Sequence, residues 1–135
     1  CHTVFSTSNV SESKYIPIED VFVYKISLEL CDLGWQLYEF LSWQDRKILG
    51  DQFIRSVDSN AANIVEGYGR FHYLDRIKFY YNARASLMES KHWCDLMYKR
   101  EKITQEKYKL FVERAQQVHY QLNKWIKTTY SSRDS

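Results

Sequence analysis

Apolar residues recur at steps of three and four along most of this chain, which is the spacing of a helix with one buried side. Short polar segments interrupt the pattern three times. The sequence therefore predicts four helices, which span about 18–41, 45–66, 73–99 and 104–129. Because the connections are short, consecutive helices should pack antiparallel, and the expected fold is an all-α, up-down four-helix bundle.

Residues with known capping preferences mark the expected helix ends. Ser42 or Asp45 suits the N-cap of the second helix, and Thr104 suits that of the fourth. Gly67 and Gly69 are expected to end the second helix, because glycine adopts the left-handed C-terminal conformation without steric cost.

The spacing also predicts which positions form the bundle interior. In the first helix these are Phe22, Ile26, Leu30, Leu33, Leu37 and Leu41. In the third helix they are Tyr80, Ala83, Leu87, Ser90, Cys94 and Met97. Core packing is the simplest interpretation of both rows.

The first helix carries a second apolar stripe, formed by Tyr24, Leu28, Cys31, Trp35 and Tyr38. At about 100° per residue, this stripe lies nearly opposite the first one. Large apolar patches are uncommon on monomers, so Tyr24, Leu28, Trp35 and Tyr38 are candidate oligomer contacts. The alternative is that the aromatic side chains fill the edges of a single bundle and keep their polar tips in water.

The net charge is +2, but it is unevenly spread. Residues 18–58 hold four basic and eight acidic side chains, whereas residues 66–133 hold fourteen basic and seven acidic ones. A basic second half favours contact with nucleic-acid phosphates. The candidate residues are Arg70, Arg76, Lys78, Arg84, Lys99, Arg100 and Lys102. Two alternatives remain: the charges keep the surface soluble, or the two halves complement one another across a subunit contact.

Motifs of enzyme chemistry are weak in this chain. Glu89 and His92 form one Glu-x-x-His unit, but a di-iron bundle needs two, so a metal-dependent enzyme in the core is the least favoured function. No cofactor is expected. Cys31 and Cys94 are interpreted as small core residues and reduced thiols.

Composition sets the domain organisation and the expected location. With 135 residues and 44% hydrophobic content, one bundle domain is expected over residues 18–130. A flexible tail at 1–17 and a short tail at 131–135 should flank it. Neither a secretory signal nor a membrane-spanning run is evident, so a cytoplasmic protein without membrane contact is expected.

The stretch from Gln52 to Arg70, QFIRSVDSNAANIVEGYGR, closely resembles the signature of the bacterial four-helix bundle family of 23S rRNA intervening-sequence proteins. The match is strongest from Asn63 to Arg70. A second, weaker motif of that family is similar to Phe79, Ala83, Ser86, Leu87 and Glu89. The family often has proline where this chain has Ala61, a change of little consequence within a helix.

The resemblance implies a left-handed bundle that assembles as a ring-like homopentamer without a settled biochemical activity. A related accessory protein of diversity-generating retroelements binds nucleic acid and a reverse transcriptase, but it is much more basic than this chain. The expectation is therefore a non-enzymatic, RNA- or ribosome-linked accessory protein. The alternative is a protein–protein interaction scaffold that binds no nucleic acid.

The polar residues of the signature, Asn63, Glu66 and Arg70, have two interpretations. In the structural one, Asn63 and Glu66 satisfy hydrogen bonds near the helix end and Arg70 pairs with a carboxylate. In the functional one, Glu66 and Arg70 face a ligand or RNA. The structural interpretation is preferred.

Overall fold

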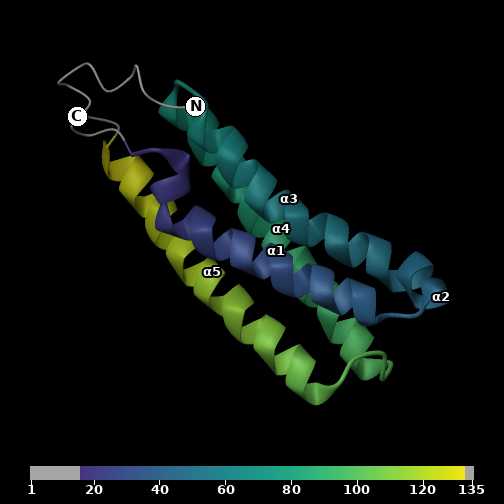
Figure 1. Cartoon of the computed structure of the whole chain (residues 1–135). Coiled ribbons are helices and arrows are strands. Elements are labelled where there is room, and N and C mark those ends of the chain that lie inside the picture. Colours follow the sequence, from purple (N-terminus) through teal and green to yellow (C-terminus); the bar gives the residue numbers. More distant parts are fainter. Residues whose placement is uncertain (1–15, 133–135) are drawn as a thin grey trace.

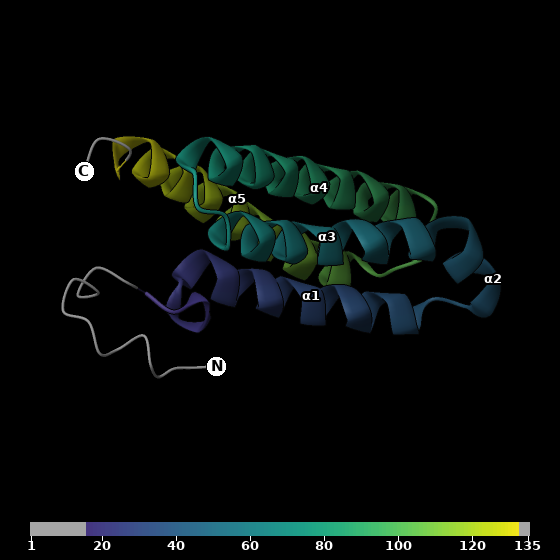
Figure 2. The same cartoon turned by 90° about the horizontal axis from the view of Figure 1, so that it is seen from above.

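Four long helices run side by side in alternating directions (Figures 1 and 2), as the hydrophobic spacing predicts. The computed structural model describes residues 16–132. Its elements are a 3-10 turn at Ile18–Asp20, α1 at Phe22–Phe40, α2 at Trp43–Asp45, a π-helical turn at Arg46–Gly50, α3 at Asp51–Tyr68, α4 at Tyr73–Lys99 and α5 at Gln105–Ser131. No strand occurs in this part of the chain.

The packing order closes the four helices into one bundle. α1 packs on α3, α3 on α4, α4 on α5, and α5 on α1. Consequently the α1–α3 pair and the α4–α5 pair form opposite sides of the molecule. α2 and the α4–α5 turn lie at one end of the bundle, and the α3–α4 turn lies at the other (Figure 1).

Capping side chains set two of the helix starts where they were predicted. Ser42 Oγ accepts a hydrogen bond from the Asp45 N–H at 3.1 Å, so the second helical segment begins at α2. Thr104 Oγ1 accepts from the Lys107 N–H at 3.2 Å, at the start of α5. The first helix starts later than predicted, at Phe22, because the residues after Pro17 form a 3-10 turn.

The prediction that Gly67 and Gly69 end the helix in a left-handed conformation is wrong. Among the described residues no glycine has a positive φ; α3 ends at Tyr68, and Gly69 follows it with φ −80°. Gly67 is buried within α3, where its missing side chain allows a close approach to α4. A Cβ at this position would lie 2.7 Å from Tyr80 Cε1 and 3.0 Å from Phe79 Cβ. The glycine is therefore needed for packing, not for chain reversal.

The left-handed helix end occurs instead after α4. Glu101 has φ 60°, the only positive φ outside glycine in the described residues. The Lys102 N–H donates to Met97 O at 2.8 Å, and the Glu101 N–H donates to Tyr98 O at 3.0 Å. This pair of bonds is a Schellman motif, which usually carries glycine where this chain has glutamate.

The interior follows the predicted rows, except that Leu33 is only partly buried and Phe22 is exposed. All six predicted positions of α4 are buried. An inter-helix hydrogen bond also crosses the core, where Asn60 Nδ2 donates to Ala83 O at 3.0 Å. Phe22, predicted to be core, is 56% exposed, because Val21 and Val23 occupy the inward positions at the start of α1.

The predicted tails lie mostly outside the described residues, which begin at Ile16. At the other terminus, α5 includes Ser131, one residue past the predicted end of the bundle. In the described part of the chain, none of the helices combines the length and apolarity that a membrane crossing would need.

Candidate functional site

The charge imbalance of the sequence becomes a difference between two sides of the bundle. Within α1 and α3 there are two basic and six acidic residues, a net charge of −4. Within α4 and α5 there are ten basic and five acidic residues, a net charge of +5. Because these helix pairs are opposite each other, one side of the molecule is acidic and the other is basic.

The residues predicted to form an oligomer interface divide into two groups. Tyr24 and Tyr38 are half-buried, and the Tyr38 hydroxyl donates to Asp51 Oδ1 of α3 at 2.7 Å. Leu28 and Trp35 are exposed, by 42% and 50%. The stripe therefore flanks the core on its α3 side, and does not lie opposite the core as the helical wheel suggests. Only its outer edge is open to a partner.

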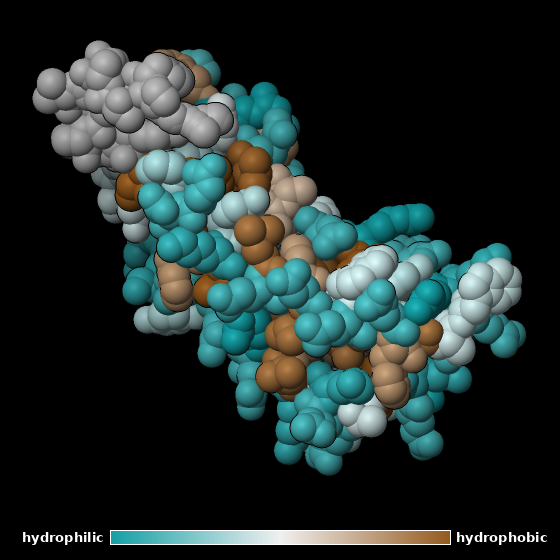
Figure 3. Space-filling model, viewed as in Figure 1, coloured by the Kyte–Doolittle hydropathy of each residue, from teal (hydrophilic) through white to brown (hydrophobic). Residues whose placement is uncertain are grey.

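Both charged sides also carry exposed apolar side chains. The acidic side has Leu28 and Trp35, and the basic side has Leu74, Tyr81 and Met88 at intervals of seven along α4. Figure 3, which looks onto α1, shows hydrophobic side chains reaching the surface between hydrophilic ones along the bundle. Each side thus combines one sign of charge with apolar contact area.

The signature polar residues form local hydrogen bonds. Asn63 Nδ2 donates to Ser59 O at 2.9 Å and to Ser59 Oγ at 3.1 Å, and the Ser86 hydroxyl of α4 donates to the same Oγ at 3.0 Å. Arg70 Nη2 pairs with Glu66 Oε2 at 2.6 Å. Asn63 thus bonds within α3, whereas the Glu66–Arg70 pair lies at the surface, with side chains 52% and 44% exposed.

The predicted nucleic-acid residues fall into two groups at opposite ends of α4. From Arg76 to Lys99 the helix rises by about 35 Å, at ~1.5 Å per residue. One group lies at the α3–α4 end (Arg70, Arg76 and Lys78), and the other lies at the α4–α5 turn (Lys99, Arg100 and Lys102). Arg84 lies between them and donates to Asn123 Oδ1 at 2.8 Å.

At the α3–α4 end the arginines are largely engaged within the chain. The Arg70 guanidinium lies 4.7 Å from the centre of the Phe79 ring, and Arg76 Nε donates to Arg70 O at 2.7 Å. Lys78 is exposed beside the same ring, at 5.8 Å. These contacts hold the turn between α3 and α4 and leave Lys78 as its most available cation.

At the opposite end, two connections meet. Lys102 Nζ of the α4–α5 turn lies 3.4 Å from Asp45 Oδ1 of α2, and Lys107 Nζ lies 4.8 Å from the centre of the Phe40 ring. We call this surface, made by residues 40–48 and 99–109, the turn end. It holds seven basic and three acidic residues, a net charge of +4.

Sequence reasoning found only half of the turn end. It singled out the cations from Lys99 to Lys102 but missed Trp43 and Lys47. The aromatic–cation spacing of four residues within one helical turn was the available signal. In an up-down bundle the first and third connections lie at the same end. The predicted topology was therefore enough to place residues 40–48 beside residues 99–109.

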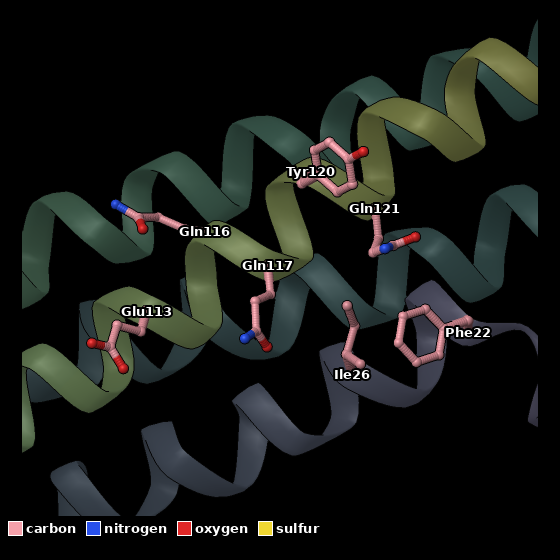
Figure 4. Close-up of a pocket in the computed structure, with 7 residues that line it drawn as sticks. All are labelled: Phe22, Ile26, Glu113, Gln116, Gln117, Tyr120 and Gln121. Carbon is pink, nitrogen blue, oxygen red and sulfur yellow. The ribbon is translucent and has the colours of Figure 1, made fainter.

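A shallow groove of about 600 Å³ lies between α1 and α5 (Figure 4). It is lined by Phe22, Ile26, Glu113, Gln116, Gln117, Tyr120 and Gln121. Amide and aromatic side chains dominate this lining, and Glu113 is its one ionisable carboxylate. This set offers contact area but no pairing of acid, base or nucleophile.

The Glu-x-x-His unit is not arranged as a metal site. Glu89 Oε2 accepts a hydrogen bond from Trp93 Nε1 at 3.1 Å, and the His92 ring contacts the Trp93 ring edge-on. Between residues 16 and 132, no three His, Cys, Asp or Glu side chains are grouped so that they could hold a metal ion. Burial raises the pKa of Cys31 and Cys94 to about 12, so both thiols are protonated at neutral pH.

These features define an antiparallel four-helix bundle with oppositely charged sides and a basic, aromatic end. Residues 19–124 match the family of 23S rRNA-intervening sequence proteins, and the chain belongs to this family. A crystal structure of a protein of unknown function from the S23 ribosomal protein family of Bacteroides thetaiotaomicron is similar to it, with a TM-score of 0.74 and 29% identity. That match covers 78% of this chain and 98% of the other. No curated protein matches this chain.

Proposed function

We propose that this protein is a non-enzymatic, homo-oligomeric accessory protein that binds nucleic acid through its phosphates. The observation that carries the proposal is the turn end. Two connections that are far apart in the sequence bring seven cations onto one surface, where three acidic residues oppose them. Such a cluster neutralises phosphates and releases their counterions, which is the main source of affinity without sequence preference.

The family's name gives this proposal an RNA context, since it refers to intervening sequences of 23S rRNA. The similar crystal structure is described as a member of a ribosomal protein family of unknown function. Neither description names a reaction. An RNA-linked role is therefore compatible with the family, and the cation cluster supplies the physical reason for it.

Oligomerisation is supported by the opposite sides of the bundle. An acidic, apolar side and a basic, apolar side on the same subunit are complementary, so one subunit can contact the next head to tail. Contacts of this kind close into rings when the rotation between subunits allows it. Five subunits is the number that the resemblance to the family suggests.

Light scattering tests the assembly. The wild-type protein should have a mass several times 16.3 kDa at micromolar concentration. The double substitution Leu28→Glu with Trp35→Glu should reduce the mass to that of one subunit while circular dichroism stays helical, because both side chains are outside the core. Phe71→Glu, an exposed change at the α3–α4 turn, is the control and should keep the assembly. A wild-type monomer would refute this part of the proposal.

Fluorescence anisotropy with a structured RNA and a duplex DNA tests the nucleic-acid contact. Replacing Lys99, Arg100 and Lys102 with glutamine should weaken binding and make the slope of log K against log salt shallower by about 2, at ~0.7–0.9 per lost phosphate contact. Arg76→Gln with Lys78→Gln removes two cations at the opposite end and should change both the affinity and the salt slope less. Absence of binding at low salt would refute the proposal.

A scaffold that binds other proteins is the second candidate function. The exposed apolar residues at the turn end, Phe40, Trp43 and Ile48, favour it, because such groups also suit a protein partner. This function would replace the first if neither RNA nor DNA binds. A metal-dependent enzyme is the third candidate, and no grouping of ligands in the described residues supports it.

A further inference from the structure

We infer that the turn end binds unpaired bases, which stack on Trp43 while the surrounding lysines contact the phosphates of the same strand. The inference rests on the proposed nucleic-acid function and names its substrate as single-stranded RNA or DNA. The observation behind it is an exposed aromatic ring that lies beside a cation, on the surface where the two connections meet.

Trp43 is the most exposed of the four tryptophans, at 70%. It is the first residue of α2, directly after the capping residue Ser42. Lys47 Nζ lies 4.2 Å from the centre of its indole ring. A cation over one face leaves the other face of this largely exposed ring available. Such a ring can stack on a base while the neighbouring ammonium meets the phosphate.

The segment that carries Trp43 is fixed by its neighbours. Arg46 Nε donates to Tyr38 O at 3.0 Å, and Arg46 Nη2 donates to Glu39 O at 2.9 Å. The guanidinium also lies 5.0 Å from the centre of the Tyr38 ring. These contacts tie α2 to the C-terminal end of α1. Because the backbone of this segment is already positioned, it loses little conformational entropy when a base stacks on Trp43, and this favours affinity.

The same arrangement occurs a second time at the turn end. Phe40 is 50% exposed, and Lys107 lies over its ring. Two exposed rings, each with a lysine, therefore share a surface with a net charge of +4. An apolar protein partner would have to desolvate these lysines, whereas a polyanion with planar bases satisfies rings and cations together. This is why a nucleic-acid strand is the occupant that fits best.

An unpaired strand suits the rings better than a duplex does. Bases within a helix are already stacked on one another, so they expose no face to an aromatic side chain. In a single strand the bases are free to turn outward. Phosphate contacts occur with single strands and duplexes alike. A preference for the single strand is therefore the property that identifies stacking.

The test compares two single strands, oligouridylate and oligothymidylate, with a duplex hairpin. The loop of the hairpin is an abasic linker, so that the hairpin has no unpaired bases. Trp43→Ala should weaken single-strand binding about 5- to 150-fold, which corresponds to ~1–3 kcal/mol for one stacked base. Trp43→Phe should retain most of the affinity. Hairpin affinity should be unchanged in both variants. Phe71→Ala, which removes an exposed ring at the other end, is the matched control.

Two further readouts separate stacking from charge. Single-strand binding should quench the tryptophan fluorescence of the wild-type protein, and most of this quenching should disappear in Trp43→Ala. The salt slope should be the same in both, because no cation is removed. The inference would be overturned if Trp43→Ala kept full affinity for single strands, or if it lost affinity equally for single strands and the hairpin. Either result would still be consistent with the proposed phosphate contacts. Failure of every nucleic acid to bind would overturn both.

Discussion

Gly67→Ala should destabilise the bundle, because the new methyl group has no room against α4. A Cβ at Gly67 would lie 2.7 Å from Tyr80 Cε1 and 3.0 Å from Phe79 Cβ. The Tyr80 side chain is fully buried and cannot turn away, and the Phe79 contact is close to the backbone. Overpacking of this kind costs about 1–3 kcal/mol. The higher helix propensity of alanine offsets up to ~1 kcal/mol of this cost, so a net loss of about 1 kcal/mol is expected.

Gly69→Ala is the matched control, two residues further along the chain. The nearest atoms to a Cβ there are Val65 O and Glu66 O, at 3.6 and 3.7 Å, which is ordinary contact. Its φ of −80° suits alanine, so this variant should gain about 0.4–1 kcal/mol through the unfolded state. Urea unfolding measures both variants, at one fixed protein concentration so that the proposed oligomerisation does not affect the comparison. Equal stability of the two variants would show that α3 and α4 do not approach closely at Gly67.

Three further predictions concern stability. Glu101→Gly should stabilise the protein by about 1 kcal/mol in urea unfolding, because it relieves a left-handed backbone, whereas Glu101→Gln should not. Thr104→Ala should cost about 1 kcal/mol in the same assay, because the N-cap of α5 is lost. Burial raises the pKa of both Cys31 and Cys94 from 9.0 to about 12. Cys94, which is fully buried, should react with a thiol reagent only after unfolding. Above pH 9 the unfolded thiols ionise while the native ones keep their protons, so urea midpoints should fall between pH 9 and 12, and less so in Cys94→Ala.

Helix number and direction could be predicted from the sequence because they depend on local patterns. Ser42 and Thr104 mark helix starts by a hydrogen bond to their own next turn, and the spacing of Leu87 and Cys94 identifies the buried row of α4. Phe22 could not be placed in this way. Its position depends on where α1 begins, and the residues before it form a 3-10 turn.

Gly67 and Trp43 show what local patterns leave undetermined. A glycine near a helix end has two physical uses, chain reversal and close approach, and only the position of α4 distinguishes them. The short helix α2, which begins at Trp43, is joined to a connection more than fifty residues away by the ion pair between Lys102 and Asp45. The excess of basic residues in the second half of the chain could be predicted from composition. Only the packing order shows that these residues lie partly on the α4–α5 side and partly at the turn end.

The proposed assembly and the proposed nucleic-acid binding should be separable, because different surfaces are assigned to them. A contact between the sides of two bundles leaves their ends uncovered, so each subunit of the oligomer would still present its turn end. Several turn ends on one particle raise the apparent affinity for a long strand through effective concentration. Leu28→Glu with Trp35→Glu should therefore weaken binding to a long RNA more than binding to a short oligonucleotide. The glutamine variant of Lys99, Arg100 and Lys102 should weaken both and keep the assembled mass. If each variant abolished assembly and binding together, the two functions would share one surface, and the assignment of the turn end to nucleic acid would be wrong.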